Sequence, residues 1–157
     1  MSNTLLLVGP NGSGKSHRFQ QLIAMHAADP TSTTWAVDPH HELTAADRHT
    51  TPDGAEQFLT DALALVEQRN SRGREHTATE AEPRVLLLVD EAEQLLRQQP
   101  LADLLHRLAV TGRKAGVETA LAVRDTTLQV WPLGLRQQYL TPENAEVLPP
   151  RRHHAED

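Results

Sequence analysis

The chain has 157 residues, no cysteine and a formal net charge of −6. This length suggests one domain with a real core, and because aromatic residues make up only 3% of the chain, Leu, Val and Ala have to build it. The charge excludes a strongly basic nucleic-acid-binding surface over the whole chain, but not a local basic patch or a pore shared by several subunits. The absence of cysteine excludes disulfides and thiolate sites.

The N-terminus lacks the basic and apolar regions of a signal peptide. The longest aliphatic run, Val85 to Val89, is too short to span a bilayer. We therefore expect no membrane segment and a cytoplasmic location.

The first predicted element is a buried parallel strand from Leu5 to Val8. A match to the phosphate-binding pattern G-x-x-x-x-G-K-[ST] follows it, and consists of Gly9, Pro10, Asn11, Gly12, Ser13, Gly14, Lys15 and Ser16. Glycines permit turns with positive φ, so the loop's N–H groups can surround an anion. We expect these residues and His17 to bind ATP, with Lys15 at the phosphates and the Ser16 hydroxyl on Mg²⁺. The alternative is a glycine-rich turn without a ligand.

Hydrophobic periodicity predicts the next elements. A helix follows the loop and ends near Asp29-Pro30, and a second strand runs from Thr33 to Val37. Residues 40–51 could be a loop or a short irregular helix. Thr51-Pro52 then starts a helix that reaches about Arg69.

The second half of the chain continues the alternation. Polar residues 70–83 indicate a mobile loop, and residues 85–89 a central strand. Helical spacing over 92–108 is interrupted at Pro100, and residues 119–123 form a fourth strand. This order predicts an α/β fold with a largely parallel sheet. We expect one domain over residues 1–140, an undecided short element within 133–140, and a disordered tail over 141–157.

Two acidic residues, Asp90 and Glu91, end the central strand. An Asp at this place resembles a Walker B element, which holds Mg²⁺ beside a phosphate-binding loop. The adjacent Glu91 is suited to orient and polarise an attacking water. The alternative is a pair of solvated acids at a helix start, where negative charge is favourable.

Further charged residues follow the last helix and the last strand. Arg113 is a candidate arginine finger that reaches the γ-phosphate of a neighbouring subunit, whereas Lys114 can equally complement the helix dipole. Arg124, followed by Asp125, could sense the γ-phosphate or form an ordinary surface salt bridge. The nine histidines show no metal-ligand spacing.

The chain resembles the motor domain of FtsK/SpoIIIE-type DNA translocases and their HerA and conjugative-transfer relatives. Four stretches carry the resemblance: residues 9–16, 35–43, 85–91, and 108–117 with 121–123. It covers residues 4 to about 135 and implies a RecA-like P-loop NTPase fold, ATPase activity, a ring that could be a hexamer, and double-stranded DNA as a partner. Two departures stand out: His40 replaces the family's Lys, and Arg124 stands near its usual Gln. The family's additional domains do not fit in 157 residues.

Three functions remain open on these residues. The first is an ATPase of the translocase type, acting in DNA transfer or translocation. The second is a nucleotide-dependent interaction module with weak ATPase activity that serves a larger partner of a transfer machine. The third is a small-molecule P-loop kinase, for which Arg72, Arg74 and Arg84 could form a lid.

Overall fold

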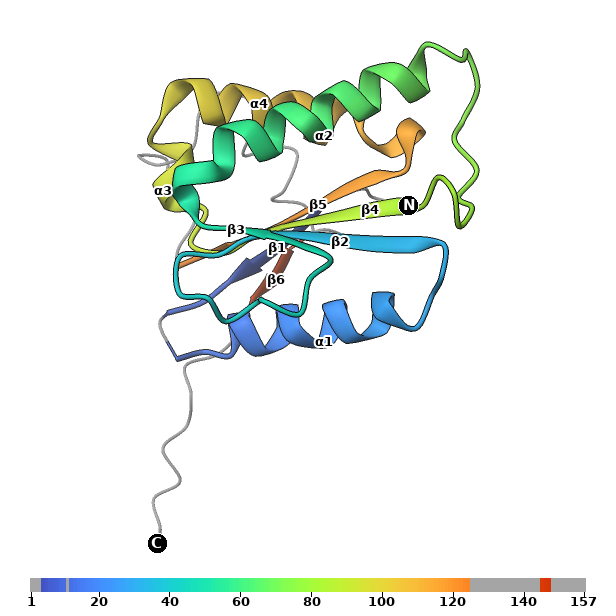
Figure 1. The fold of residues 1–157 in the computed structure, drawn as a ribbon. Coiled ribbons are helices and arrows are strands. Elements are labelled where there is room, and N and C mark those ends of the chain that lie inside the picture. The colour runs from blue at the N-terminus through green and yellow to red at the C-terminus, as the bar shows by residue number, and fades with distance from the viewer. Residues whose placement is uncertain (1–3, 11, 125–144, 148–157) are drawn as a thin grey trace, which may run out of the picture.

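The computed structural model describes residues 4–10, 12–124 and 145–147 (Figure 1). The predictions for Asn11, Asp125, the element within 133–140 and residues 148–157 lie outside this part of the chain.

One sheet of six parallel strands forms the centre of the fold, in the order β3-β2-β4-β5-β1-β6. The strands are β1 (Thr4–Val8), β2 (Ser32–Val37), β3 (Arg48–Thr50), β4 (Arg84–Val89), β5 (Val117–Val123) and β6 (Ala145–Val147). In the register, Val89 at the end of β4 lies opposite Val37 of β2 and Leu121 of β5. The carboxyl ends of β1, β2, β4 and β5 therefore lie along one edge, where ligands bind in such sheets.

Helices cover both faces of this sheet (Figure 1). They are α1 (Lys15–Ala27), α2 (Ala55–Asn70), α3 (Glu93–Leu96) and α4 (Gln99–Thr111), with short 3₁₀ turns η1 (Pro52–Gly54) and η2 (Arg113–Ala115). Figure 1 shows α1 on one face and α2 with α4 on the other.

The alternation of side chains along β4 explains this arrangement. Leu86 and Leu88 pack in the cluster on the α1 side, whereas Leu87 and Val89 pack in the cluster that contains α2 and α4. All four are 5% exposed or less, and burying each such side chain stabilises the fold by about 1.5–3 kcal/mol. A strand that is apolar on both faces is typical of the middle of a parallel sheet.

Several predicted boundaries differ from the observed ones. The helix expected from Thr51 begins as the 3₁₀ turn η1, and the Thr51 side chain makes no capping hydrogen bond. The undecided residues 40–51 contain the edge strand β3. The interruption predicted at Pro100 is confirmed: the helical stretch after residue 92 is two helices, and Pro100 stands in the first turn of α4, where its missing N–H costs nothing.

The sheet also extends past residue 140, the predicted end of the domain. Strand β6, within the expected tail, pairs with β1, with Leu6 opposite Ala145. Three residues are too few to show a periodic pattern. Their pairing also depends on β1 having an edge available for another strand, which the local sequence does not indicate.

The sequence suggested a mobile loop over residues 70–83, but Asn70 ends α2 and segment 71–83 folds back onto η2 and the start of β4. The His76 N–H donates to the carbonyl of Lys114 at 2.8 Å. The buried Arg69 donates to the carbonyls of Ala115 and Pro83, at 3.0 and 2.9 Å. The segment therefore lies at the amino ends of β4 and β5. Within the described residues, no helix is both long and apolar enough to cross a membrane.

Candidate nucleotide-binding site

A cavity of about 840 Å³ opens at the carboxyl edge of the sheet. Four loops line it, those that follow β1, β2, β4 and β5. The lining residues are Gly12, Ser13, Gly14, Lys15, Ser16, His17, His40, Glu42, Asp90, Glu91, Glu93 and Arg124. Residues far apart in the sequence therefore meet in one place.

The loop between β1 and α1 has the backbone that the glycine pattern predicts. Gly12 and Gly14 have φ values of 80° and 99°, which a side chain would strain. Gly14 caps α1, whose N-terminus directs its positive dipole end into the loop. Lys15 Nζ donates to the carbonyl oxygens of Gly9 and, at 3.1 Å, Pro10. Burial lowers the pKa of Lys15, although Asp90 opposes this effect.

The structure brings together Ser16 and Asp90, the two residues expected to hold Mg²⁺. Ser16 Oγ donates to Asp90 Oδ2 at 3.1 Å. Burial raises the pKa of Asp90, which is only 3% exposed, while the hydrogen bonds from Ser16 and the Glu91 N–H oppose the rise. A hydroxyl and a buried carboxylate are hard oxygen ligands of the kind that Mg²⁺ takes, so these residues fit the ion. No group of three or more His, Asp or Glu side chains in the described ranges could hold a metal by itself.

Glu91 lines this cavity and has an unusual backbone conformation. Its φ is 48°, a region that non-glycine residues rarely adopt, and its N–H donates to Asp90 Oδ1 at 2.9 Å. One carboxylate oxygen lies 2.7 Å from His40 Nε2, and the other accepts from Gln94 Nε2 at 2.7 Å. A hydrogen-bonding partner therefore holds each carboxylate oxygen of Glu91, the predicted general base.

Asp38, which directly follows β2 at this edge of the sheet, supports the site without lining it. It is fully buried and accepts from the N–H groups of His40 and Leu43 at 3.0 and 2.7 Å, and its Oδ2 lies 3.2 Å from His49 Nε2. Burial by itself would raise the pKa of Asp38, but these hydrogen bonds outweigh it and lower the pKa. The carboxylate thus shapes the loop after β2.

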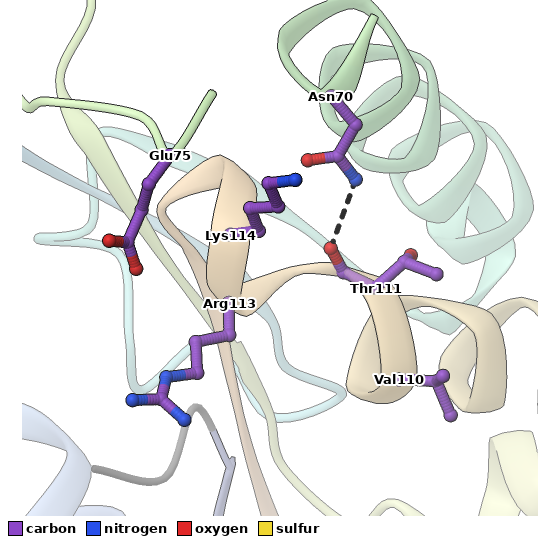
Figure 2. A pocket seen from close by; sticks show the side chains of 6 residues that line it. All are labelled: Asn70, Glu75, Val110, Thr111, Arg113 and Lys114. Carbon is purple, nitrogen blue, oxygen red and sulfur yellow. Dashed lines mark hydrogen bonds between the residues drawn. The ribbon is translucent and has the colours of Figure 1, made fainter. Parts of the chain in front are cut away.

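Arg113 lies elsewhere. Arg113 and Lys114 line a separate cavity of about 570 Å³. Figure 2 shows both on one turn, with Glu75 on one side and Asn70 and Thr111 on the other. This turn precedes β5, and the seven residues of β5 at about 3.3 Å each separate it from the nucleotide cavity by roughly 20 Å. Within one chain Arg113 cannot meet Lys15, so its role in catalysis stays a prediction that requires a second copy.

Arg124 does line the nucleotide cavity. It directly follows β5, which lies between β1 and β4, and its N–H donates to Glu93 Oε2 at 2.6 Å. Its charge contributes to the lowered pKa of Lys15. The sequence reasoning missed His40, Glu42 and Glu93 as lining residues. The only local signal for His40 is its place after the Asp38-Pro39 end of a strand.

No known family model and no curated protein matches the chain. Among solved structures it is similar to one titled "ATPase", at 16% identity and a TM-score of 0.70. It is similar to the cytoplasmic domain of EssC, at 14% and 0.73, and to the pCW3 conjugation coupling protein TcpA in a monomer form with ATPgS, at 17% and 0.69. These alignments cover 94%, 95% and 86% of this chain, and 65%, 33% and 47% of the others.

At these identities the likeness establishes the fold. The chain spans less than two thirds of the length of these structures. The predicted α/β class, with a parallel sheet flanked by helices, is confirmed. The chain has the RecA-like fold of the P-loop ATPases.

Proposed function

We propose that the chain binds ATP with Mg²⁺ and hydrolyses it, as part of a DNA transfer or translocation machine related to the FtsK and HerA ATPases. The observation that carries this proposal is the meeting of Lys15, the Ser16–Asp90 pair and Glu91 in one cavity. These are the groups that phosphoryl transfer to water requires.

Each residue has a distinct task in this reaction. Lys15 binds the β- and γ-phosphates, and Arg124 adds a second positive charge within the same cavity. Ser16 and Asp90 hold Mg²⁺, which neutralises phosphate charge when bound. Glu91 accepts a proton from water as the water oxygen bonds to the γ-phosphorus. The bond from that phosphorus to the β–γ bridging oxygen breaks, and ADP and phosphate leave.

The DNA and the ring are supported by the resemblance, and the neighbours' names support a part in a larger machine. One neighbour is a conjugation coupling protein, and another is a type VII secretion ATPase, EccC. We propose that the chain works as a ring of identical copies, as the resemblance implies, or within a larger machine.

A nucleotide-dependent interaction module is the second candidate function. Arg124 stands near the place where the resembled family has Gln, and this favours a switch with slow hydrolysis. A kinase would need a lid over the nucleotide cavity at the carboxyl edge of the sheet. Segment 71–83 instead folds against the amino ends of β4 and β5, which argues against the kinase alternative. Arg72 there pairs with Glu82.

The test measures binding of a fluorescent ATP analogue and release of phosphate, with and without double-stranded DNA. Lys15→Ala should abolish binding, because the phosphates lose their cation. Glu91→Gln should keep binding and slow hydrolysis by about 10²-fold or more, since the amide cannot accept the proton. Arg107→Ala, which removes an exposed cation on α4, serves as the matched control and should change neither.

Phosphate release without DNA stimulation, from a protein that stays monomeric with ATP, would favour the interaction module. Equal ATP binding by the wild type and Lys15→Ala would refute the assigned site.

A further inference from the structure

We propose that His40 is a positioning residue for Glu91, and that it keeps the carboxylate directed into the nucleotide cavity. This inference rests on the proposed function, in which Glu91 accepts a proton from water.

The contacts of Glu91 are the first argument. His40 Nε2 lies 2.7 Å from Oε1, and Gln94 Nε2 lies 2.7 Å from Oε2. One donor to each oxygen fixes the rotation of the carboxylate and leaves one acceptor site on each oxygen free. The carboxylate is therefore oriented and still has free lone pairs that can accept a proton, as a general base requires.

The anchoring of His40 is the second argument. Its N–H donates to the buried carboxylate of Asp38, which also accepts from the N–H of Leu43. The Leu43 side chain is fully buried, and Gln20 of α1 donates to the carbonyl of Glu42 at 3.1 Å. Although the His40 side chain is 54% exposed, its backbone belongs to a fixed loop.

The placement of the two strands is the third argument. β2 and β4 are neighbours, and the Asp90 N–H donates to the carbonyl of Val37 at 2.9 Å. This pairing fixes the separation between the loop after β2 and the acidic residues that follow β4. This separation places His40 within reach of Glu91, although 51 residues separate them in the chain.

The charges around the imidazole favour the same role. The hydrogen bond and the charge of Glu91 raise the pKa of His40, with smaller contributions from Glu42 and Asp90 against a small effect of burial. The raised pKa favours the form of the imidazole that donates to Glu91.

The experiment compares His40→Phe, which keeps a ring without a donor, with His40→Gln, which keeps a side-chain N–H. We expect His40→Phe to lower kcat by roughly ten- to a hundred-fold, because the base loses its orientation. KM and the affinity for the ATP analogue should stay within twofold. His40→Gln should restore most of the rate, which a purely structural role of the ring would not predict. In a Glu91→Gln background, His40→Phe should have no further effect.

Gln94→Ala should lower kcat in the same way, since it removes the second donor. Gln98→Ala, four residues later, is the matched control and should leave kcat unchanged, because the Gln98 side chain donates to the backbone carbonyl of Gln94 and not to Glu91. Thermal melting of each variant identifies any loss of folding.

The outcomes separate this inference from the proposed function. If the wild type hydrolyses ATP and His40→Phe is equally fast, or if His40→Phe still slows the Glu91→Gln enzyme, the positioning role is refuted while the ATPase stands. If the wild type releases no phosphate with or without DNA, the proposed function fails and the role of His40 fails with it.

Discussion

Asp90 is buried, so its ionised carboxylate has little contact with water. Because burial makes its pKa higher in the folded chain than in the unfolded chain, its ionisation costs more in the folded state. Its contribution to the free energy of unfolding therefore falls as the pH rises from the unfolded pKa through the folded one, and at neutral pH the carboxylate destabilises the free protein.

Asp90→Asn should accordingly raise the melting temperature of the nucleotide-free protein at pH 7, by about 2–4 °C for each kcal/mol relieved. The same variant should lose the stabilisation by ATP with Mg²⁺, which for the wild type reaches about 2.7 kcal/mol at a hundredfold excess over Kd. Thermal melts at several pH values measure both effects, and the difference between variant and wild type should shrink in acid. Asp103→Asn, at an exposed carboxylate on α4, is the control. A lower melting temperature with unchanged ligand stabilisation would contradict this assignment.

At the scale of elements, the connection from α4 to β5 depends on close backbone contacts. The Val117 N–H donates to the carbonyl of Gly112 at 2.9 Å. A Cβ on Gly112 would lie 2.5 Å from the carbonyl oxygen of Val117 and 2.6 Å from that of Leu108. Both are backbone atoms, so the turn would have to shift.

Gly112→Ala should therefore lower the free energy of unfolding by about 2–3 kcal/mol, as overpacking does. Gly73→Ala is the matched control: its φ of 72° strains a side chain, but no atom lies within 4 Å. That substitution should cost only about 1 kcal/mol. Urea denaturation measures both, and equal costs would show that the contact at Gly112 relaxes freely.

At the scale of the whole molecule, the two proposed catalytic regions lie at opposite edges of the sheet. The nucleotide cavity is at the carboxyl edge, and Arg113 and Lys114 line the cavity before β5. For Arg113 to reach a γ-phosphate, the amino edge of one copy must face the carboxyl edge of the next. Such a head-to-tail contact builds rings when its rotation closes.

Arg113→Ala should then slow hydrolysis by about 10³-fold or more at protein concentrations where the wild type assembles. It should leave ATP binding by a single chain unchanged. Mass measurement with and without ATP, Mg²⁺ and DNA, combined with phosphate release over a range of protein concentrations, tests this. Arg74→Ala, an exposed cation in the segment packed beside η2, is the control. A wild-type rate per chain that does not depend on concentration, with Arg113→Ala equally active, would exclude a role in trans.

The amino-acid sequence by itself determined the local parts of this protein. Glycine spacing gives the loop before Lys15 its backbone, and aliphatic runs give the strands that Asp38, Asp90 and Arg124 directly follow. These features depend on residues within a few positions of each other, so period and turn chemistry suffice to predict them. The same alternation predicted the fold class.

Only the tertiary structure decided which of these parts meet. The contact of His40 with Glu91 and the pairing of β6 with β1 depend on strand order, which local patterns do not encode. Arg113 lies far from Lys15 although the sequence suggested both for catalysis, because Arg113 precedes β5 and Lys15 follows the parallel neighbour β1. The physical reason is that neighbours in a parallel sheet are joined by long crossovers. Residues that share a cavity can therefore lie 50 or more positions apart, and packing of the whole core selects them.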